Sequence, residues 1–429
     1  MHPAKISVIG SGYAGLVNAV GFAHLENKVI CVDIDQKKID LINKGIPPIY
    51  EEGLEENLKD ALKKGNIKAT TDISRSVMET DITFIAVGTP SNDDGSIDLK
   101  YIKKVSEDLG NILKKKDRYH TITVKSTVVP GTTEDIVAKT IESVSGKKRG
   151  KDFGLAMSPE FLREGKAMDD FLKPDRIVIG EHDKKSGDIL YALNKLLTDN
   201  IIRTDIKTAE MIKYTSNAFL ATKISFTNEI GNICKKLEID VYDVMKGVGM
   251  DFRISPYFLS AGCGFGGSCF PKDVKALIAK SKSIGYEPEL LESVIKVNKS
   301  QPKMMIYLAK KHLENLKDKK ITLLGLAFKP GTDDIREAPA IIIIEELLKV
   351  GAKITVYDPQ AMGNIKAIFS DRITYAPTKK DAIAASDAIM IVTEWDEFRD
   401  EKLYSQKLVI DGRKTLNKRT TKNYEGICW

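Results

Sequence analysis

Short apolar runs alternate with longer apolar segments along the first third of the chain, in the order of a strand–helix–strand unit. Residues 5–10 predict a buried strand, 16–24 an apolar helix and 29–32 a second strand. Apolar runs at 81–87 and 120–125 continue the alternation, and each leads into small hydroxyl and proline residues. Strands that alternate with helices in this way indicate a parallel, doubly wound sheet.

The same order of elements returns near the end of the chain, which indicates a loose internal duplication. The pattern predicts a strand, a helix and three further strands at 321–325, 339–350, 353–358, 388–392 and 408–413. This second module carries Lys329, Arg336 and Arg413 near its strand ends, which suits a phosphate-bearing ligand. Ordinary surface charge explains these cations equally well.

Residues 208–237 between the two modules predict one long helix, because apolar residues recur at helical spacing. At 1.5 Å per residue it would span about 45 Å, enough to bridge two domains. Lys213 and Asn217 are four residues apart and share a face. Such a pair can stabilise an oxyanion, although an exposed lysine beside a helix-tolerant asparagine is the commoner outcome.

The glycine-rich turn at 10–15 lies between the first predicted strand and helix. In a dinucleotide-binding fingerprint, Gly10 makes the turn, Gly12 lets a pyrophosphate approach the backbone and Gly15 lets the helix pack on the strand. Asp33 ends the second strand, where its carboxylate can bind a ribose 2′-hydroxyl and repel a 2′-phosphate. We therefore expect NAD as the cofactor, in preference to NADP.

Polar residues follow the later strands of the first module. Thr89, Ser126 and Thr127 are expected to face the nicotinamide half of the cofactor, because ligands bind beyond the carboxyl ends of such strands. Capping of turns would explain them equally well. Glu160 and Glu164 would share a face if Pro159 began a helical turn, and a solvated face is the simpler interpretation of that pair alone.

The segment 262–273 is a glycine-rich loop that presents Cys269 just before an apolar, helix-like run, with Asp273 four residues later. A cysteine reacts as its thiolate, which a helix N-terminus or a neighbouring cation favours. An inert, half-buried thiol in a turn is the alternative.

Composition excludes several classes of protein. The chain has 429 residues, 42% hydrophobic and 29% charged, with a net charge of +6, which suits an anionic small substrate and is no nucleic-acid signature. Five cysteines without a CxxC pair argue against a disulfide framework and a structural zinc site. The sequence has no apolar run of membrane-spanning length and no signal peptide, so we expect a soluble, cytoplasmic protein that holds no metal.

Six motifs together resemble the UDP-glucose/GDP-mannose dehydrogenase family across nearly the whole chain. They are GSGYAGL, GTPSNDDGSIDL, KSTVVPGTT, SPEFLREGKA, GFGGSCFPKD and GLAFKPGTDDIRE, and the long helix with Lys213 and Asn217 adds to them. The resemblance implies an α/β fold with two Rossmann-like doubly wound domains, joined by a long central helix and an all-α dimerisation region. The implied domains are an NAD-binding domain at 1–205, a helical region with the cysteine loop at 206–312 and a UDP-sugar-binding domain at 313–429.

The resemblance also implies a four-electron oxidation at C6 of a nucleotide sugar, using two NAD and one water, by a homodimer or a dimer-based oligomer. Cys269 would be the nucleophile, forming a thiohemiacetal and then a thioester. Lys213 and Asn217 would stabilise the oxyanion, Asp273 and Thr127 would hold the catalytic water, and Glu160 would serve as the base in hydrolysis.

Further positions match residues that contact ligands in the family. Those implied for the cofactor are Gly10, Gly12, Tyr13, Ala14, Gly15, Asp33, Lys38, Thr89, Ser126, Thr127, Glu164 and Arg336. Those implied for the substrate are Glu160, Phe161, Leu162, Glu164, Lys213, Asn217, Arg253, Phe258, Gly264, Phe265, Gly266, Phe328, Lys329 and Arg413. Arg253 would reach a diphosphate across the dimer.

The residues after Cys269, Phe-Pro-Lys-Asp, favour UDP-glucose as the substrate. Enzymes acting on GDP-mannose or UDP-N-acetylmannosamine are the alternatives, and a non-catalytic nucleotide sensor is a third. The family resemblance supplies no role for Cys263, and the sequence leaves Cys428 and Trp429 unexplained.

Overall fold

The computed structural model describes residues 3–384, 386–404, 407–418 and 420–429. The chain forms two compact units that divide after Ser216. Each unit holds one predominantly parallel sheet, of eight and six strands. The predicted fold class, two doubly wound α/β modules with a long helical region, is confirmed.

The first unit is built on an eight-stranded sheet in the order β3-β2-β1-β4-β5-β6-β7-β8. Strands β1 to β6 are parallel, and β7 pairs antiparallel with β6. The strands are β1 (Lys5–Ile9), β2 (Lys28–Val32), β3 (Ile67–Thr70), β4 (Ile82–Ile85), β5 (Thr121–Val124), β6 (Gly154–Met157), β7 (Ile177–Glu181) and β8 (Ile201–Thr204). The order of the first six is that of a dinucleotide-binding fold.

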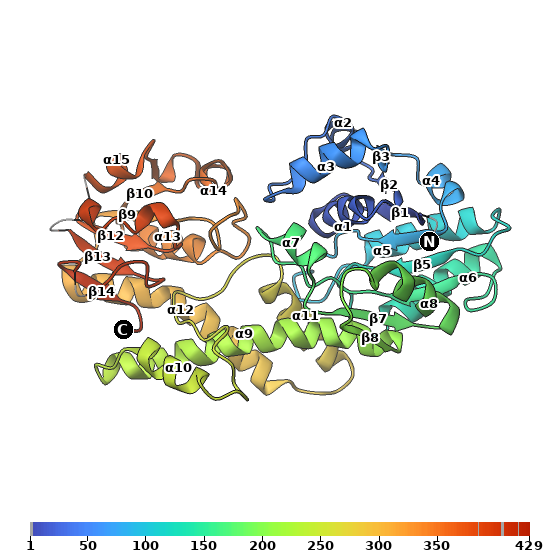
Figure 1. Ribbon diagram of the computed structural model, residues 1–429. Helices are drawn as coiled ribbons and strands as arrows, with labels where there is room; N and C mark the ends of the chain where they lie inside the picture. Colours follow the sequence, from blue (N-terminus) through green and yellow to red (C-terminus); the bar gives the residue numbers. More distant parts are fainter. Residues whose placement is uncertain (1–2, 385, 405–406, 419) are drawn as a thin grey trace. The chain divides into compact units, whose positions relative to one another are not determined.

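Helices cover both faces of this sheet (Figure 1). One hydrophobic cluster holds α1 (Tyr13–His24), α2 (Gln36–Asn43), α3 (Leu54–Lys63), α7 (Ala167–Leu172) and α8 (Lys184–Asn194). The other holds α4 (Ile73–Glu79), α5 (Lys100–Leu113), the π-helical turn Thr133–Ala138 and α6 (Lys139–Ser145). The central strands are buried on both sides, which explains why they read as short continuous apolar runs.

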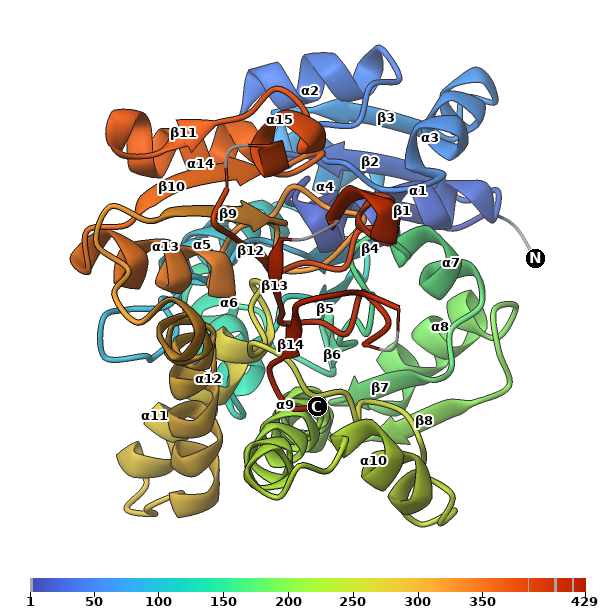
Figure 2. The same cartoon turned by 90° about the vertical axis from the view of Figure 1, so that its left-hand side faces the viewer.

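The long helix predicted at 208–237 is α9, which runs from Ile206 to Lys236 and continues through the division between the units. Three more helices follow it: α10 (Val241–Gly249), α11 (Phe270–Ser283) and α12 (Glu289–Leu313). α11 and α12 lie side by side (Figure 2). A small apolar core that includes Ala218, Phe265 and Val274 joins this helical region.

The second sheet has the order β11-β10-β9-β12-β13-β14 and is parallel throughout. Its strands are β9 (Lys320–Leu324), β10 (Lys353–Tyr357), β11 (Thr374–Tyr375), β12 (Ala388–Ile391), β13 (Leu408–Asp411) and β14 (Tyr424–Gly426). Its helices are α13 (Pro339–Lys349), α14 (Met362–Phe369) and α15 (Lys379–Ala384). The first six strands of the first sheet and the six strands of the second follow the same order, which bears out the internal duplication read from the sequence.

Two local expectations need correction or completion. No helical turn begins at Pro159, because residues 158–163 are extended or irregular, so Glu160 and Glu164 do not share a helical face. The C-terminal residues are part of the fold: Lys235 donates to the backbone carbonyls of Gly426 and Trp429, and the Trp429 indole N–H donates to the Tyr424 hydroxyl at 2.6 Å.

None of the helices in the described ranges is long and apolar enough to cross a membrane.

Candidate active site

The glycine turn of the first unit has the geometry that a pyrophosphate needs. Gly10 has a φ of +101°, and a Cβ there would lie 2.6 Å from the Ala86 carbonyl oxygen. A Cβ on Gly15 would lie 1.8 Å from the Gly10 carbonyl oxygen. Gly12, the N-cap of α1, faces open space instead. Two glycines therefore hold the turn closed, and the third leaves room for a phosphate at the helix N-terminus.

Asp33 lies at the end of β2 and closes the same turn. Its Oδ2 accepts hydrogen bonds from the Ser11 N–H at 2.8 Å and the Ser11 hydroxyl at 2.6 Å. Burial alone would raise the pKa of Asp33, but hydrogen bonds from Ser11 and Asp35 and the charge of Lys38 outweigh it and lower that pKa. The carboxylate is therefore ionised at neutral pH, as ribose binding and repulsion of a 2′-phosphate require.

Replacement of Asp33 by asparagine is expected to lower the ratio of kcat/KM for NAD to that for NADP at least about tenfold, because a hydrogen bond to a charged group contributes about 1.5–3 kcal/mol. Steady-state kinetics with each cofactor measures this ratio. Asp35→Asn is the matched control, since Asp35 caps α2 through the Lys37 N–H. An unchanged ratio in Asp33→Asn would refute the ribose assignment.

The corresponding aspartate of the second module, Asp358, accepts more hydrogen bonds than Asp33 and is more deeply buried. Asp358 follows β10 as Asp33 follows β2, but it is buried and accepts hydrogen bonds from the backbone N–H groups of Leu326, Ala327, Gln360 and Ala361. The Trp395 indole N–H donates to it as well, at 3.1 Å. Its oxygens are taken up in holding loops together, which argues against a second dinucleotide site of the same kind.

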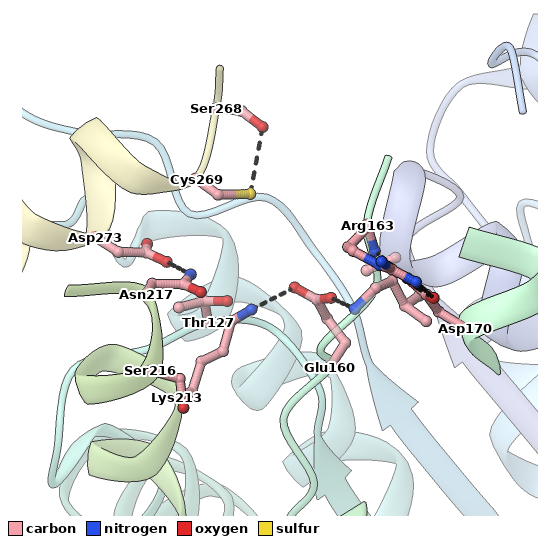
Figure 3. Close-up of polar contacts among 12 residues, drawn as sticks. Thr127, Glu160, Arg163, Asp170, Lys213, Ser216, Asn217, Ser268, Cys269 and Asp273 are labelled. Carbon is pink, nitrogen blue, oxygen red and sulfur yellow. Dashed lines mark hydrogen bonds and ion pairs between the residues drawn. The ribbon is translucent and has the colours of Figure 1, made fainter. Parts of the chain in front are cut away.

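Lys213 and Glu160 form a buried ion pair in the first unit (Figure 3). Lys213 Nζ lies 3.1 Å from Glu160 Oε1, and the two side chains are 5% and 12% exposed. The Leu162 N–H donates to Glu160 Oε2 at 2.7 Å, and the Phe161 ring centroid lies 5.4 Å from Lys213 Nζ. The segment 160–162 thus surrounds the ammonium group of Lys213, which the sequence analysis had singled out only by its place on the predicted helix.

Hydroxyl groups join the ends of β4 and β5. The Thr89 hydroxyl donates to the Thr127 carbonyl at 3.0 Å, and the Ser126 hydroxyl donates to the Val87 carbonyl at 2.7 Å. The Tyr13 hydroxyl accepts from the Gly165 N–H at 2.8 Å. These polar residues therefore shape the loops beyond the strand ends, and their predicted contacts with the cofactor stay predictions.

Sequence reasoning missed several buried ionisable residues in the first unit, among them Glu210 and Lys125. Glu210 on α9 accepts from the backbone N–H groups of Gly131 and Thr133 at 2.6 and 2.8 Å, and burial raises its pKa to about 7. Burial lowers the pKa of Lys125 to about 8, with Glu160 opposing and Lys213 reinforcing that shift. The only signal in the sequence was Lys125 directly before the predicted Ser126 and Thr127.

Cys269 lies in the second unit as the N-cap of α11, and it is exposed. The Ser268 hydroxyl lies 3.6 Å from its sulfur (Figure 3). Pro271 in the first turn suits the start of a helix. The backbone of this helix N-terminus favours a thiolate over a thiol. The half-buried placement considered from the sequence is therefore wrong, and the reactivity of the thiol stays a prediction.

Asp273 lies one turn after Cys269 and is 1% exposed. The Asn217 amide donates to its Oδ2 at 2.6 Å (Figure 3). Lys272 Nζ lies 2.6 Å from its Oδ1. Asn217 and Lys213 lie one turn apart on α9, so this helix presents one of them to Glu160 and the other to Asp273.

The other cysteines are free and buried. The Cys263 sulfur lies 3.7 Å from the Val392 carbonyl oxygen, and burial raises the pKa of its thiol. Cys428 lies against Gln301, with its sulfur 3.4 Å from the amide nitrogen. Neither residue is arranged as a second nucleophile.

The remaining substrate candidates in the second unit fall into two groups. Around the cysteine loop, the Phe265 and Phe258 rings pack edge-on against Phe270, and the Phe328 ring lies against Gly267. The cations have protein partners: Arg413 Nε donates to the Val392 carbonyl, Arg336 pairs with Asp334, and Arg253 pairs with Asp251. Lys329 Nζ lies 5.5 Å from the Phe328 ring centroid.

The described side chains include no group of three or more histidine, cysteine, aspartate or glutamate residues arranged to hold a metal ion.

Three family models match successive parts of the chain. The NAD binding domain of the UDP-glucose/GDP-mannose dehydrogenase family matches residues 4–198, its central domain 207–300 and its UDP binding domain 322–418. The chain belongs to this family. It is therefore an NAD-dependent nucleotide-sugar dehydrogenase.

Individual members of the family resemble the chain over its whole length. The UDP-glucose 6-dehydrogenase of Haloferax volcanii is 45% identical, covering 99% of this chain and 100% of the relative. The GDP-mannose 6-dehydrogenase of Pseudomonas putida is 41% identical, covering 99% and 100%. The solved structure of a UDP-glucose dehydrogenase from Pyrobaculum islandicum superposes with a TM-score of 0.96 at 42% identity, covering 100% of this chain and 98% of that one.

Proposed function

We propose that this nucleotide-sugar dehydrogenase oxidises UDP-glucose to UDP-glucuronate through a covalent adduct on Cys269. The exposed thiol at the N-terminus of α11, with buried Asp273 one turn later, is the observation that carries the proposal. Similarity to UDP-glucose 6-dehydrogenases over the full chain supports the choice of substrate.

The residues divide the chemistry between them. NAD, when bound, accepts one hydride in each of the two oxidations. After the first, the Cys269 thiolate adds to the C6 aldehyde, and the cationic Lys213 and the Asn217 amide stabilise the oxyanion that forms. Loss of hydride from this thiohemiacetal leaves a thioester on sulfur. Glu160 takes a proton from the water that cleaves the thioester, and Asp273 with Thr127 orients that water, which returns Cys269 as a thiolate and releases the acid.

The first module would hold the cofactor, with Gly12 and the N-terminus of α1 at the pyrophosphate, Asp33 at the ribose, and Lys38, Thr89, Ser126 and Glu164 nearby. The second would hold the UDP group through Lys329, Phe328 and Arg413. We retain the division into 1–205, 206–312 and 313–429 as the domain assignment, and a cytoplasmic location stays a prediction.

The test is to count NADH released per sugar with UDP-glucose, GDP-mannose and UDP-N-acetylmannosamine. Two NADH per molecule of UDP-glucose, with little turnover of the others, is the expected result. GDP-mannose is the second candidate, because GDP-mannose 6-dehydrogenases match the same 99% of the chain. A clear preference for GDP-mannose, or one NADH per sugar, would contradict the proposal.

We also propose that the enzyme is a homodimer formed through α9. Large apolar side chains on this helix are exposed at seven-residue spacing: Phe219 at 63%, Phe226 at 52% and Ile233 at 52%. Leu237, one turn further on, is 63% exposed. A row of exposed apolar side chains of this kind fits a second copy of the same helix, because a symmetric interface brings one surface patch against itself.

Replacement of Phe226 by glutamate is expected to convert the dimer to a monomer, because a charge would be buried at the centre of the row. Light scattering after size-exclusion chromatography measures the mass. Leu196→Glu is the control, since Leu196 is an equally apolar residue that is 72% exposed on the first unit. A dimeric Phe226→Glu protein would place the interface elsewhere.

A further inference from the structure

Asn298, on α12, makes two hydrogen bonds to the backbone of the cysteine loop, the segment 262–273. Its Oδ1 accepts a hydrogen bond from the Phe265 N–H at 2.8 Å, and its Nδ2 donates to the Phe265 carbonyl at 2.9 Å. Phe265 lies outside any helix or strand, so these bonds satisfy peptide groups that no ladder or helical turn would pair. A side-chain amide can donate and accept at once in this geometry, whereas a carboxylate or an apolar side chain cannot.

Both the cysteine loop and α12 have residues next to these hydrogen bonds that are compatible with them. Gly264 has a φ of +99°, and a Cβ there would lie 2.9 Å from Asn298 Oδ1 and 3.3 Å from the Asn298 carbonyl oxygen. Pro302 lies inside α12 four residues after Asn298, and it has no N–H to give to that carbonyl. α12 therefore lacks one backbone hydrogen bond at the Asn298 carbonyl, although the helix continues through Pro302.

A short series of contacts leads from Asn298 to the nucleophile. The Phe265 ring is 7% exposed and packs edge-on against the Phe270 ring, with centroids 6.0 Å apart. Phe270 is the first residue of α11, directly after the N-cap Cys269. On the other side, the Gly267 N–H donates to the Arg336 carbonyl at 2.8 Å, so the loop is held at two points four and two residues before Cys269.

We propose that Asn298 is a positioning residue that fixes the Cys269 loop for the covalent step. The inference rests on the proposed function, because it assigns Asn298 to the placement of a nucleophile. Asn298 itself touches no reacting atom in this account. Its effect is on where the sulfur lies when the aldehyde arrives, and displacement by about an ångström at such a site can cost up to about a hundredfold in rate.

The test compares Asn298→Leu and Asn298→Asp with wild type and with Asn232→Leu as the matched control. Asn232 is an amide on α9 whose side chain bonds Gln301, so its loss removes a similar internal hydrogen bond that involves no residue of the cysteine loop. Kinetics of the complete enzyme give kcat and KM for the nucleotide sugar. Iodoacetamide gives the alkylation rate of Cys269, the exposed thiol among four buried ones.

Asn298→Leu is expected to lower kcat at least about tenfold with KM within about threefold, and to change the alkylation rate at least about threefold. In Asn298→Asp the carboxylate can only accept, but its protonated form can also donate to the Phe265 carbonyl. The kcat of Asn298→Asp relative to wild type is therefore expected to rise as the pH falls. Asn232→Leu should change neither kcat nor alkylation.

Two results would overturn the inference. One is an Asn298→Leu variant with the same kcat and alkylation rate as Asn232→Leu. The other is a kcat of Asn298→Asp relative to wild type that does not vary with pH. The second variant keeps the test decisive if Asn298→Leu fails to fold. Failure of the proposed function looks different. If Cys269→Ser still produced the acid, the nucleophile assignment would fall whatever Asn298 does. If Cys269→Ser stopped acid formation while Asn298→Leu behaved as the control, only the role of Asn298 would be wrong.

Discussion

Replacement of Cys269 by serine is expected to lower acid formation by at least about a thousandfold, the size of loss seen when a catalytic nucleophile is removed. Simple hydride loss converts an alcohol to an aldehyde without a covalent partner, but oxidation of the aldehyde needs a tetrahedral adduct. A serine hydroxyl at the N-terminus of α11 is a weaker acid and a weaker nucleophile than a thiol, so it does not form that adduct readily. NAD binding should be retained.

The measurements are NADH per molecule of UDP-glucose, the acid product, and NAD affinity by fluorescence. Cys234→Ala is the control, because Cys234 is a buried thiol on α9 with no role in the proposed chemistry. We expect that variant to release two NADH per sugar, as the wild type does. Full acid formation by Cys269→Ser would refute the covalent mechanism.

Replacement of Lys213 by methionine is expected to reduce both activity and stability. Loss of one donor to an oxyanion typically costs about 10²–10³ in kcat. The same change removes the cation 3.1 Å from the Glu160 carboxylate, and breaking a buried ion pair from one side costs about 3–5 kcal/mol of unfolding free energy. Activity assays and urea unfolding of the same preparation measure the two losses.

The double variant Lys213→Met/Glu160→Gln separates these losses, because it removes the buried charge along with its partner. It should regain much of the stability and none of the activity. Lys207→Met, on the same helix, is the matched control: Lys207 Nζ lies 3.7 Å from Glu134 Oε2 with its side chain 57% exposed, and such pairs contribute about 0–1 kcal/mol. Normal activity in Lys213→Met would remove Lys213 from the mechanism.

Candidate residues that depend on their neighbours in the chain could be predicted from the sequence, whereas those that depend on distant partners could not. The glycine turn, Asp33 and Cys269 were accessible because each depends on its immediate neighbours in the chain, such as a strand before it or a helix after it. The conditional helix at Pro159 was wrong because a proline permits a helical start without requiring one. The segment 160–162 instead turns its Phe161 ring and its Glu160 carboxylate toward Lys213, a residue some fifty positions later.

The order of apolar runs and punctuating glycines was sufficient for four strands of each sheet, the long helix α9 and the cysteine at a helix start, because strand and helix periodicity are local properties. The tertiary structure alone decided the partners. It occupied Asp358 with four backbone amides, buried Cys263 and Glu210, and placed the Asn298 amide on the backbone of Phe265. Apart from the bonds that Gln360 and Ala361 donate to Asp358, those hydrogen bonds join residues 30 or more positions apart. Which polar groups meet inside a core depends on packing that no local pattern records.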